Sequence, residues 1–148
     1  MAHWIRFKYN NAIHIGIENN DNIDVYDGDM FNNPVKQDEF INKEDITLLN
    51  PCKPSKIIAL WNNYKTLADE KGLSKPSNPL YLNKALSCIL GQGQDILRPK
   101  FYDEAIFYEG ELGIVIGKHC KDVEPQDSKE YIFGYTCIND VTGMDIVK

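Results

Sequence analysis

The sequence predicts an α+β domain built mostly of β-strands, with a small antiparallel meander at its N-terminus. Two observations carry this prediction: short segments alternate apolar and polar residues between Asn- and Gly-containing turns, and helical patterns are confined to brief stretches. The chain has 148 residues, of which 43% are hydrophobic and 26% charged. This composition predicts one packed domain, with at most a short appendage, and excludes wholesale disorder.

The N-terminal part carries the clearest alternation of apolar and polar residues. Three strands are expected, at residues 3–9, 12–18 and 23–26. Residues 35–50 are polar with only a weak apolar pattern, and no strand is predicted there. Prolines and turn residues near 51–55 then predict a boundary between a small β subdomain, 1–54, and a second part, 55–148.

The second part contains one strong strand signal and several weaker ones. Residues 56–61 are continuously apolar, as in a buried strand, and 64–71 form a short helical stretch. The strongest strand pattern covers 105–117. Three further segments are expected: an apolar run from 81 toward 90, a short helix at 125–132 and a strand at 135–138.

Charge and cysteine content exclude several classes of protein. The net charge of -6 repels phosphate backbones and anionic lipid, so neither nucleic acid nor a membrane is expected as a partner. No apolar run approaches the roughly 18 residues of a membrane span. The four cysteines form no C-x-x-C pair, which favours free thiols and a reducing cytoplasm.

Two glutamates in the strong strand pattern are candidates for chemistry. Because strand side chains alternate, Glu109 and Glu111 share a face with Phe107 and Val115. Burying two ionised carboxylates without a cation is very costly. The pair therefore either binds a cation or lies in water at a sheet edge, and the apolar neighbours favour the cation.

A third carboxylate follows the last predicted strand, at Asp140. Carboxylate oxygens suit Mg²⁺ or Mn²⁺, with Ca²⁺ as a further candidate, whereas zinc prefers His and Cys. The residues alone thus leave two equal alternatives: an oxygen-ligand metal site made by Glu109, Glu111 and Asp140, or carboxylates that lie in water at a sheet edge.

Several blocks of sequence, in order and spacing, resemble the fumarylacetoacetate hydrolase family over about residues 56–145. The blocks are Lys56–Leu60, Asn63–Tyr64, Pro79–Leu82 with Lys84 and Ser87, Tyr108–Leu112, Val115–Lys118, Ile132–Thr136 and Asn139–Thr142. The combination of E-x-E with an aspartate 29 residues later is the specific part of this resemblance.

The resemblance implies a mixed β-roll enzyme that binds Mg²⁺ or Mn²⁺ through the three carboxylates. Family members cleave, decarboxylate, hydrate or isomerise small 2-oxo or diketo acids. A 2-oxo carboxylate can chelate the ion, which then stabilises the enolate that forms. On the same resemblance, Lys84 and Tyr64 are expected to bind substrate, and a structural salt bridge is the equal alternative for Lys84.

Two positions depart from the family pattern. Hydrolases of the family often carry a histidine where this chain has Leu67. Glu70 is then the candidate catalytic acid or base, but without that partner a solvated position on the helix is the favoured alternative for it. Met144 stands where an arginine usually lies near the anionic substrate. Loss of the histidine favours decarboxylation or isomerisation over hydrolysis, because these reactions need less activation of water.

The length is the largest departure, because family members continue for many tens of residues beyond the position of Lys148. The chain is therefore expected to be a fragment, or a shortened member that completes its sheets by oligomerising, most simply as a homodimer. The alternative function is an inactive or truncated member that keeps the metal site as a structural or interaction module.

Overall fold

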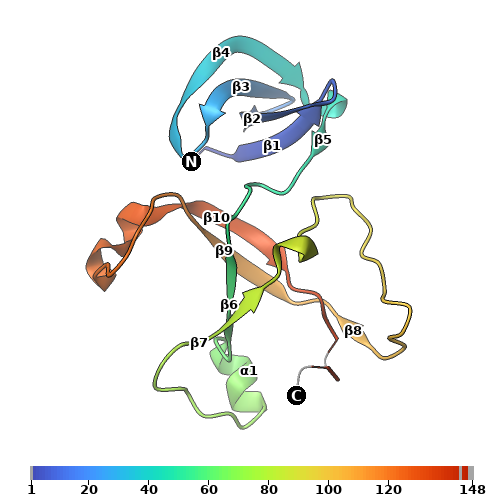
Figure 1. Ribbon diagram of the computed structural model, residues 1–148, viewed down its shortest axis with the longest axis vertical. Helices are drawn as coiled ribbons and strands as arrows, with labels where there is room; N and C mark the ends of the chain where they lie inside the picture. The colour runs from blue at the N-terminus through green and yellow to red at the C-terminus, as the bar shows by residue number, and fades with distance from the viewer. Residues whose placement is uncertain (1, 144, 147–148) are drawn as a thin grey trace.

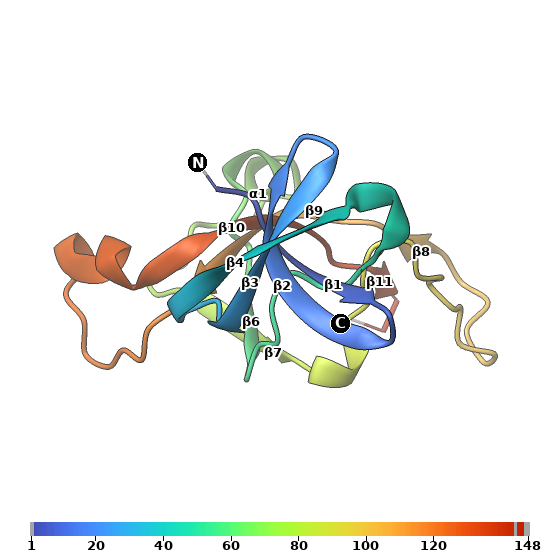
Figure 2. The same ribbon diagram turned by 90° about the horizontal axis from the view of Figure 1, so that it is seen from above.

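The structure is a computed structural model that describes residues 2–143, 145 and 146. It consists mostly of strands, as the sequence predicts. An N-terminal sheet lies at one end of the molecule, and the strands of the second part lie beyond it (Figure 1). Seen from above, these later strands extend to both sides of the N-terminal sheet (Figure 2).

The N-terminal sheet is antiparallel and has the order β4-β3-β2-β1-β5. Its strands are β1 (Trp4–Tyr9), β2 (Ala12–Asn19), β3 (Asn22–Asp29), β4 (Asn32–Asn42) and β5 (Thr47–Leu48), and the short 3₁₀ helix η1 (Lys43–Asp45) precedes β5. The turn between β1 and β2 is made by Asn10 and Asn11, whose φ angles are 46° and 64°. Asparagine tolerates this left-handed conformation, which two-residue hairpins require.

Strand β4 lies largely within the polar segment where the sequence predicts no strand, so that expectation is wrong. Only Ile41 of this strand is buried, and Phe40 beside it is 68% exposed. β4 forms the edge of the sheet, and its pairing with β3 contains two register irregularities. An edge strand that buries a single residue and changes register leaves almost no alternation in the sequence.

The buried core belongs to the N-terminal sheet. Phe7 and Ile23 are fully buried at its centre. The remaining members of this cluster are Ile5, Val25 and Ile41. Ile5 and Phe7, like Ile23 and Val25, are two positions apart, which is the strand period that the sequence shows in this part of the chain.

The second part consists of three antiparallel strand pairs with short helical turns. β6 (Ile57–Trp61) pairs with β7 (Leu80–Lys84), β9 (Gly110–Ile116) with β10 (Ile132–Asn139), and β8 (Ile106–Phe107) with β11 (Thr142–Gly143). The helical elements are α1 (Lys65–Glu70) and the 3₁₀ turns η2 (Leu86–Cys88) and η3 (Pro125–Tyr131). The short helices expected near 64–71 and 125–132 are thus present.

Many apolar side chains of the second part are exposed, contrary to the buried strand expected at 56–61. Ile58 is 53% exposed and Leu112 is 66% exposed. Phe107, expected to be buried beside the glutamates, is 48% exposed. Among the described residues, each of these strands has a single hydrogen-bonded neighbour.

The accessible surface is correspondingly large, at 12112 Å². A compact monomer of this mass exposes about 7,700 Å².

Aromatic side chains join the two parts of the chain. The ring of Phe133, in β10, lies 4.8 Å from that of Phe31 and 6.2 Å from that of Trp4, measured between ring centroids. In the described residues, no helix is long and apolar enough to cross a membrane.

Candidate metal centre

The strand predicted at 105–117 is interrupted at its centre. β8 ends at Phe107 and β9 begins at Gly110, so Tyr108 and Glu109 lie in a two-residue gap. The pairing on either side nevertheless keeps one register, because Phe107 pairs with Thr142 and Gly110 with Asn139. Equal numbers of residues separate these pairs on both strands, which places Glu109 opposite Asp140.

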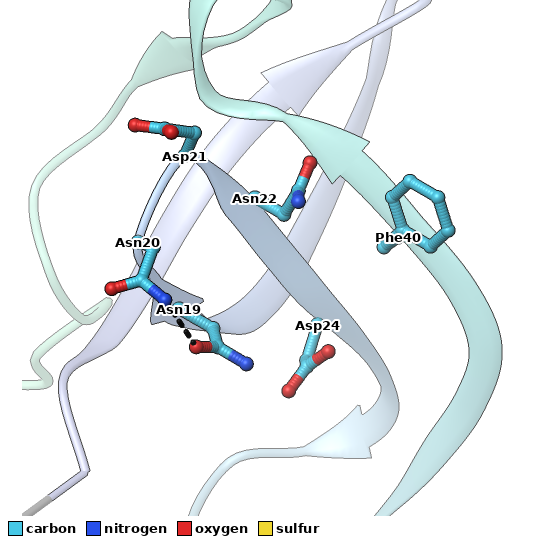
Figure 3. A pocket seen from close by; sticks show the side chains of 6 residues that line it. All are labelled: Asn19, Asn20, Asp21, Asn22, Asp24 and Phe40. Atoms are coloured by element: carbon cyan, nitrogen blue, oxygen red, sulfur yellow. Dashed lines mark hydrogen bonds between the residues drawn. The ribbon is translucent and has the colours of Figure 1, made fainter.

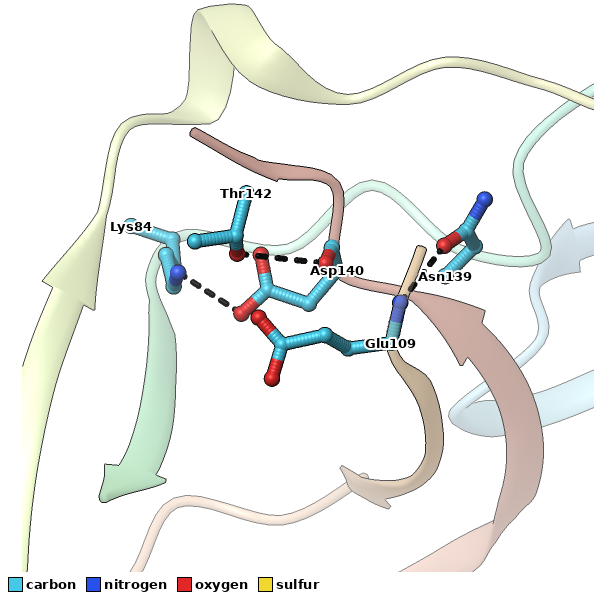
Figure 4. Close-up of polar contacts among 5 residues, drawn as sticks. All are labelled: Lys84, Glu109, Asn139, Asp140 and Thr142. Carbon is cyan, nitrogen blue, oxygen red and sulfur yellow. Dashed lines mark hydrogen bonds and ion pairs between the residues drawn. The ribbon is translucent and has the colours of Figure 1, made fainter. Parts of the chain in front are cut away.

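Two hydrogen bonds hold this position in the gap. The backbone N–H of Asp140 donates to the carbonyl oxygen of Glu109 at 2.9 Å. The backbone N–H of Glu109 donates to Oδ1 of Asn139 at 3.2 Å (Figure 4). Residues opposite one another in an antiparallel pair project their side chains from the same face. The carboxyl groups of Glu109 and Asp140 accordingly lie side by side in the figure.

Glu111 adds a third carboxyl group to the same region. It lies two residues beyond Glu109, on the strand face that Glu109 shares, and it is half-buried. Burial raises the pKa of Glu111, and repulsion from Asp140 and Glu109 raises this pKa further, whereas Lys84 lowers it. The three candidate ligands are therefore close enough to repel one another.

Lys84 supplies the positive charge at this face. Its Nζ lies 2.7 Å from Oδ2 of Asp140, and both side chains are mostly buried, with 33% and 20% of their surface exposed. Lys84 is the last residue of β7, so this ion pair connects β7 with the end of β10. Thr142 also contacts Asp140, donating from its hydroxyl to the Asp140 carbonyl at 3.3 Å.

The donor chemistry of this face fits Mg²⁺ or Mn²⁺, because three hard-oxygen carboxylates face one ammonium and negative charge is in excess. In the arrangement seen here, however, no three His, Cys, Asp or Glu side chains among the described residues are close enough together to hold one ion. Binding a shared ion would require the carboxylates to turn toward one another.

Of the other predicted site residues, Tyr64 lies close to the carboxylates and Glu70 is not joined to them by any hydrogen bond or ion pair among the described residues. The Tyr64 hydroxyl donates to the Gly110 carbonyl at 3.4 Å, so Tyr64 lies beside the start of β9. Glu70 is exposed at the end of α1, and no hydrogen bond or ion pair joins it to the three carboxylates in the part of the chain that the structure describes. Leu67 is 44% exposed on the same helix. Met144 lies outside the described residues.

Asn139, whose Oδ1 accepts a hydrogen bond from the backbone N–H of Glu109, is a site residue that the sequence alone does not predict. The available signal was its place directly before Asp140, at the end of a predicted strand. Side-chain amides at strand ends commonly bond to nearby backbone groups.

Two depressions in the surface lie away from the carboxylates. One, of about 410 Å³, is open and polar and is lined by Asn19, Asn20, Asp21, Asn22, Asp24 and Phe40 (Figure 3). The other, of about 250 Å³, lies at the junction between the two parts and includes Phe31 and Phe133. Neither includes Glu109, Glu111 or Asp140 among its lining residues.

Comparison with protein-family models identifies both parts of the chain. Residues 56–148 match the fumarylacetoacetate (FAA) hydrolase C-terminal domain, and residues 2–51 match the Rv2993c-like N-terminal domain. The chain belongs to the fumarylacetoacetate hydrolase family, and the resemblance found in its sequence is confirmed.

Two curated proteins of known name are similar to the chain. The chain is 38% identical over 102 residues to the fumarylacetoacetate hydrolase domain-containing protein 2 homolog of Dictyostelium discoideum, covering 69% of this chain and 33% of that protein. It is 35% identical over 99 residues to the oxaloacetate tautomerase YisK of Bacillus subtilis, covering 65% of this chain and 33% of that protein.

A solved structure confirms the predicted fold. The 5-carboxymethyl-2-hydroxymuconate delta-isomerase of Mycobacterium smegmatis superposes with a TM-score of 0.85 at 30% identity, over 99% of this chain and 57% of that chain. The chain thus spans about a third of the length of the two curated relatives and little more than half of the solved one.

Proposed function

We propose that this chain carries the divalent-metal site of an enzyme that acts on small 2-oxo or diketo acids, by keto-enol tautomerisation or at the neighbouring C–C bond. The observation that carries the proposal is the position of Glu109 opposite Asp140, with Glu111 on the same face. The similarity to an oxaloacetate tautomerase and to a hydroxymuconate isomerase supports this substrate class.

Mg²⁺ or Mn²⁺ would be held by Glu109, Glu111 and Asp140. When bound, such an ion supplies a Lewis acid that lowers the cost of negative charge on a keto oxygen. The ammonium of Lys84, 2.7 Å from Asp140, is placed to attract the carboxylate of an oxo acid. The hydroxyl of Tyr64 lies at the start of β9, where it would donate a hydrogen bond to a substrate oxygen in place of the Gly110 carbonyl.

Tautomerisation is the favoured reaction within this class. It moves a proton between carbon and oxygen and consumes no water, so it does not need the histidine that Leu67 replaces. Glu70 remains the proposed acid or base, as an exposed carboxylate on α1.

An absorbance assay of enol-oxaloacetate conversion tests the proposal. We expect the rate to rise with added Mg²⁺ or Mn²⁺, to fall to the uncatalysed rate with EDTA, and to be lost in Asp140→Asn. Oxaloacetate decarboxylation and acylpyruvate cleavage, followed in parallel, distinguish the three reactions. Metal-independent rates for all of these substrates would contradict the proposal.

A second function is favoured by the exposed apolar surface. The accessible surface exceeds that of a compact monomer by about 4,400 Å², and a typical protein interface covers only about 800 Å² per partner. We propose that the chain acts within a larger assembly, most simply a homodimer. A chain that binds metal and assembles but turns over no oxo acid would instead be an interaction module.

Sedimentation equilibrium tests this assembly directly. Self-association at micromolar concentration is the expected result. A stable, folded monomer with a cooperative melt would contradict it.

A further inference from the structure

The hydrogen bonding of the gap between β8 and β9 departs from that of an ordinary antiparallel ladder. Two residues that form a hydrogen-bonded pair normally exchange two backbone bonds. Asp140 and Glu109 make one of these, from the Asp140 N–H to the Glu109 carbonyl at 2.9 Å. The Glu109 N–H donates instead to Oδ1 of Asn139, and the Asp140 carbonyl accepts a bond from the Thr142 hydroxyl. A side-chain amide thus stands in for one ladder bond.

This exchange of hydrogen-bond partners occurs beside a cluster of three carboxylates. Carboxylates directly opposite one another across a strand pair repel, and here Glu111 adds a third negative charge. The ladder is interrupted between Phe107 and Gly110 and resumes in the same register. Two hydrogen bonds fix the backbone of Glu109 in the gap between β8 and β9: its N–H donates to Oδ1 of Asn139, and its carbonyl oxygen accepts from the N–H of Asp140.

We infer that Asn139 is a positioning residue of the metal site: its side-chain amide fixes the backbone of Glu109, and so keeps the carboxyl group of Glu109 beside that of Asp140 for a shared cation. The inference rests on the proposed metal site and adds a named residue to it. Groups that orient metal ligands typically change metal affinity by about 10- to 100-fold when they are removed.

The geometry specifies which substitutions preserve this role. Only an acceptor oxygen at the position of Oδ1 can receive the Glu109 N–H. Asn139→Asp keeps that oxygen, whereas Asn139→Leu keeps the shape of the side chain and removes the acceptor. Cys137 is exposed in the same strand, two residues earlier, so Cys137→Ala is a matched control for general damage to β10.

The experiment measures two quantities on the full chain: Mg²⁺ affinity by calorimetry, and hydrogen exchange of the Glu109 amide by NMR without metal. In Asn139→Leu we expect loss of the protection of that amide and about tenfold weaker Mg²⁺ binding. Asn139→Asp should retain the protection of the amide and, because it adds a negative charge beside the carboxylates, should bind Mg²⁺ at least as tightly. Cys137→Ala should match the unsubstituted chain. If Asn139→Leu does not fold, Asn139→Ser, whose oxygen is too short to reach, takes its place with the same expectations.

The outcomes separate the inference from the proposed function. Mg²⁺ binding that is equally tight in the unsubstituted chain and in Asn139→Leu overturns the role of Asn139. A residue that only stabilised β10 would lower the melting temperature without changing metal affinity, and this result also overturns it. Absence of Mg²⁺ binding to the unsubstituted chain overturns the metal site itself, while the exchange of the Glu109 amide still reports whether Asn139 fixes that backbone.

Discussion

Glu109 and Asp140 lie opposite each other across the gap between β8 and β9, joined by a hydrogen bond of 2.9 Å from the Asp140 N–H to the Glu109 carbonyl oxygen. The unbroken register on both sides fixes this arrangement. Two carboxylates so placed are unfavourable without positive charge between them. Lys84 provides one such charge, and a divalent cation would provide more.

Asp140→Asn should remove the response to metal at little cost to the metal-free protein. The substitution loses a mostly buried ion pair with Lys84, but it also relieves the repulsion between Asp140 and Glu111, and Lys84 keeps Glu111 as a neighbouring negative charge. Because these effects oppose each other, urea unfolding in EDTA should show a loss well below the roughly 3–5 kcal/mol that breaking an isolated buried ion pair costs. Thermal melts with added Mg²⁺ should show a rise in melting temperature only for the unsubstituted chain. An equal rise in both proteins would contradict the assignment of Asp140.

Glu111→Gln should stabilise the metal-free protein at neutral pH. Burial and the neighbouring carboxylates raise the pKa of Glu111, so the folded state binds this proton more tightly than the unfolded state. The free energy of unfolding therefore falls as pH rises through the raised pKa, and the glutamine variant escapes this loss. Since Glu111 is only half-buried, solvent screens the repulsion and we expect a gain of only about 0.5 kcal/mol at pH 7.

The pH dependence provides the control for Glu111. Below the pKa of the unfolded carboxyl, both proteins are neutral at this position and their unfolding free energies should converge. Urea titrations at several pH values measure this difference. If the stability advantage of Glu111→Gln over the unsubstituted chain grew toward acid pH, the ionised carboxylate of Glu111 would not be its cause.

Lys84→Met should strengthen metal binding and weaken substrate binding. The ammonium lies 2.7 Å from an oxygen of Asp140 and competes with a metal ion for that carboxylate. Its removal also leaves the carboxylates without a counter-charge, so the metal-free protein should lose about 1 kcal/mol. Calorimetry with Mg²⁺ and the KM for oxaloacetate measure the two effects. Weaker Mg²⁺ binding in the variant would contradict the account of Lys84.

Phe133→Ala should weaken the junction between the N-terminal sheet and β10. The ring of Phe133 packs against those of Phe31 and Trp4, and its loss should cost about 2 kcal/mol, less than for a fully buried phenylalanine. Phe101, which is 86% exposed, offers a matched control, with a change within about 0.5 kcal/mol on substitution by alanine. Equal losses in the two variants would show that this junction contributes nothing specific.

The parts of the fold that the sequence predicts well are those where one face of a strand is buried. Phe7 and Ile23 lie at the centre of the core, and their strands show clear alternation. The sequence does not predict β4, because an edge strand that buries only Ile41 shows no alternation of apolar and polar residues. The apolar residues around Phe107 in the strand pattern predict that its side chain is buried, yet it is 48% exposed. Burial depends on which other parts of the fold pack against a side chain, and the neighbouring residues in the sequence do not determine this.

The candidate site was predictable in its membership but not in its geometry. The spacing of Glu109, Glu111 and Asp140 identifies the acidic residues and, with the neighbouring blocks, the family. The gap that sets Glu109 opposite Asp140 depends on pairing between residues about thirty positions apart. The bond from the Glu109 N–H to Asn139 likewise depends on three-dimensional register, which alternation along one strand cannot show.

The most direct test of the account is calorimetric titration of Mg²⁺ into the metal-free chain and into Asp140→Asn. The account predicts one binding event per chain, which disappears in the variant. Titrations that show no binding to the unsubstituted chain, or the same binding to both proteins, would contradict the claim that these carboxylates form a metal site.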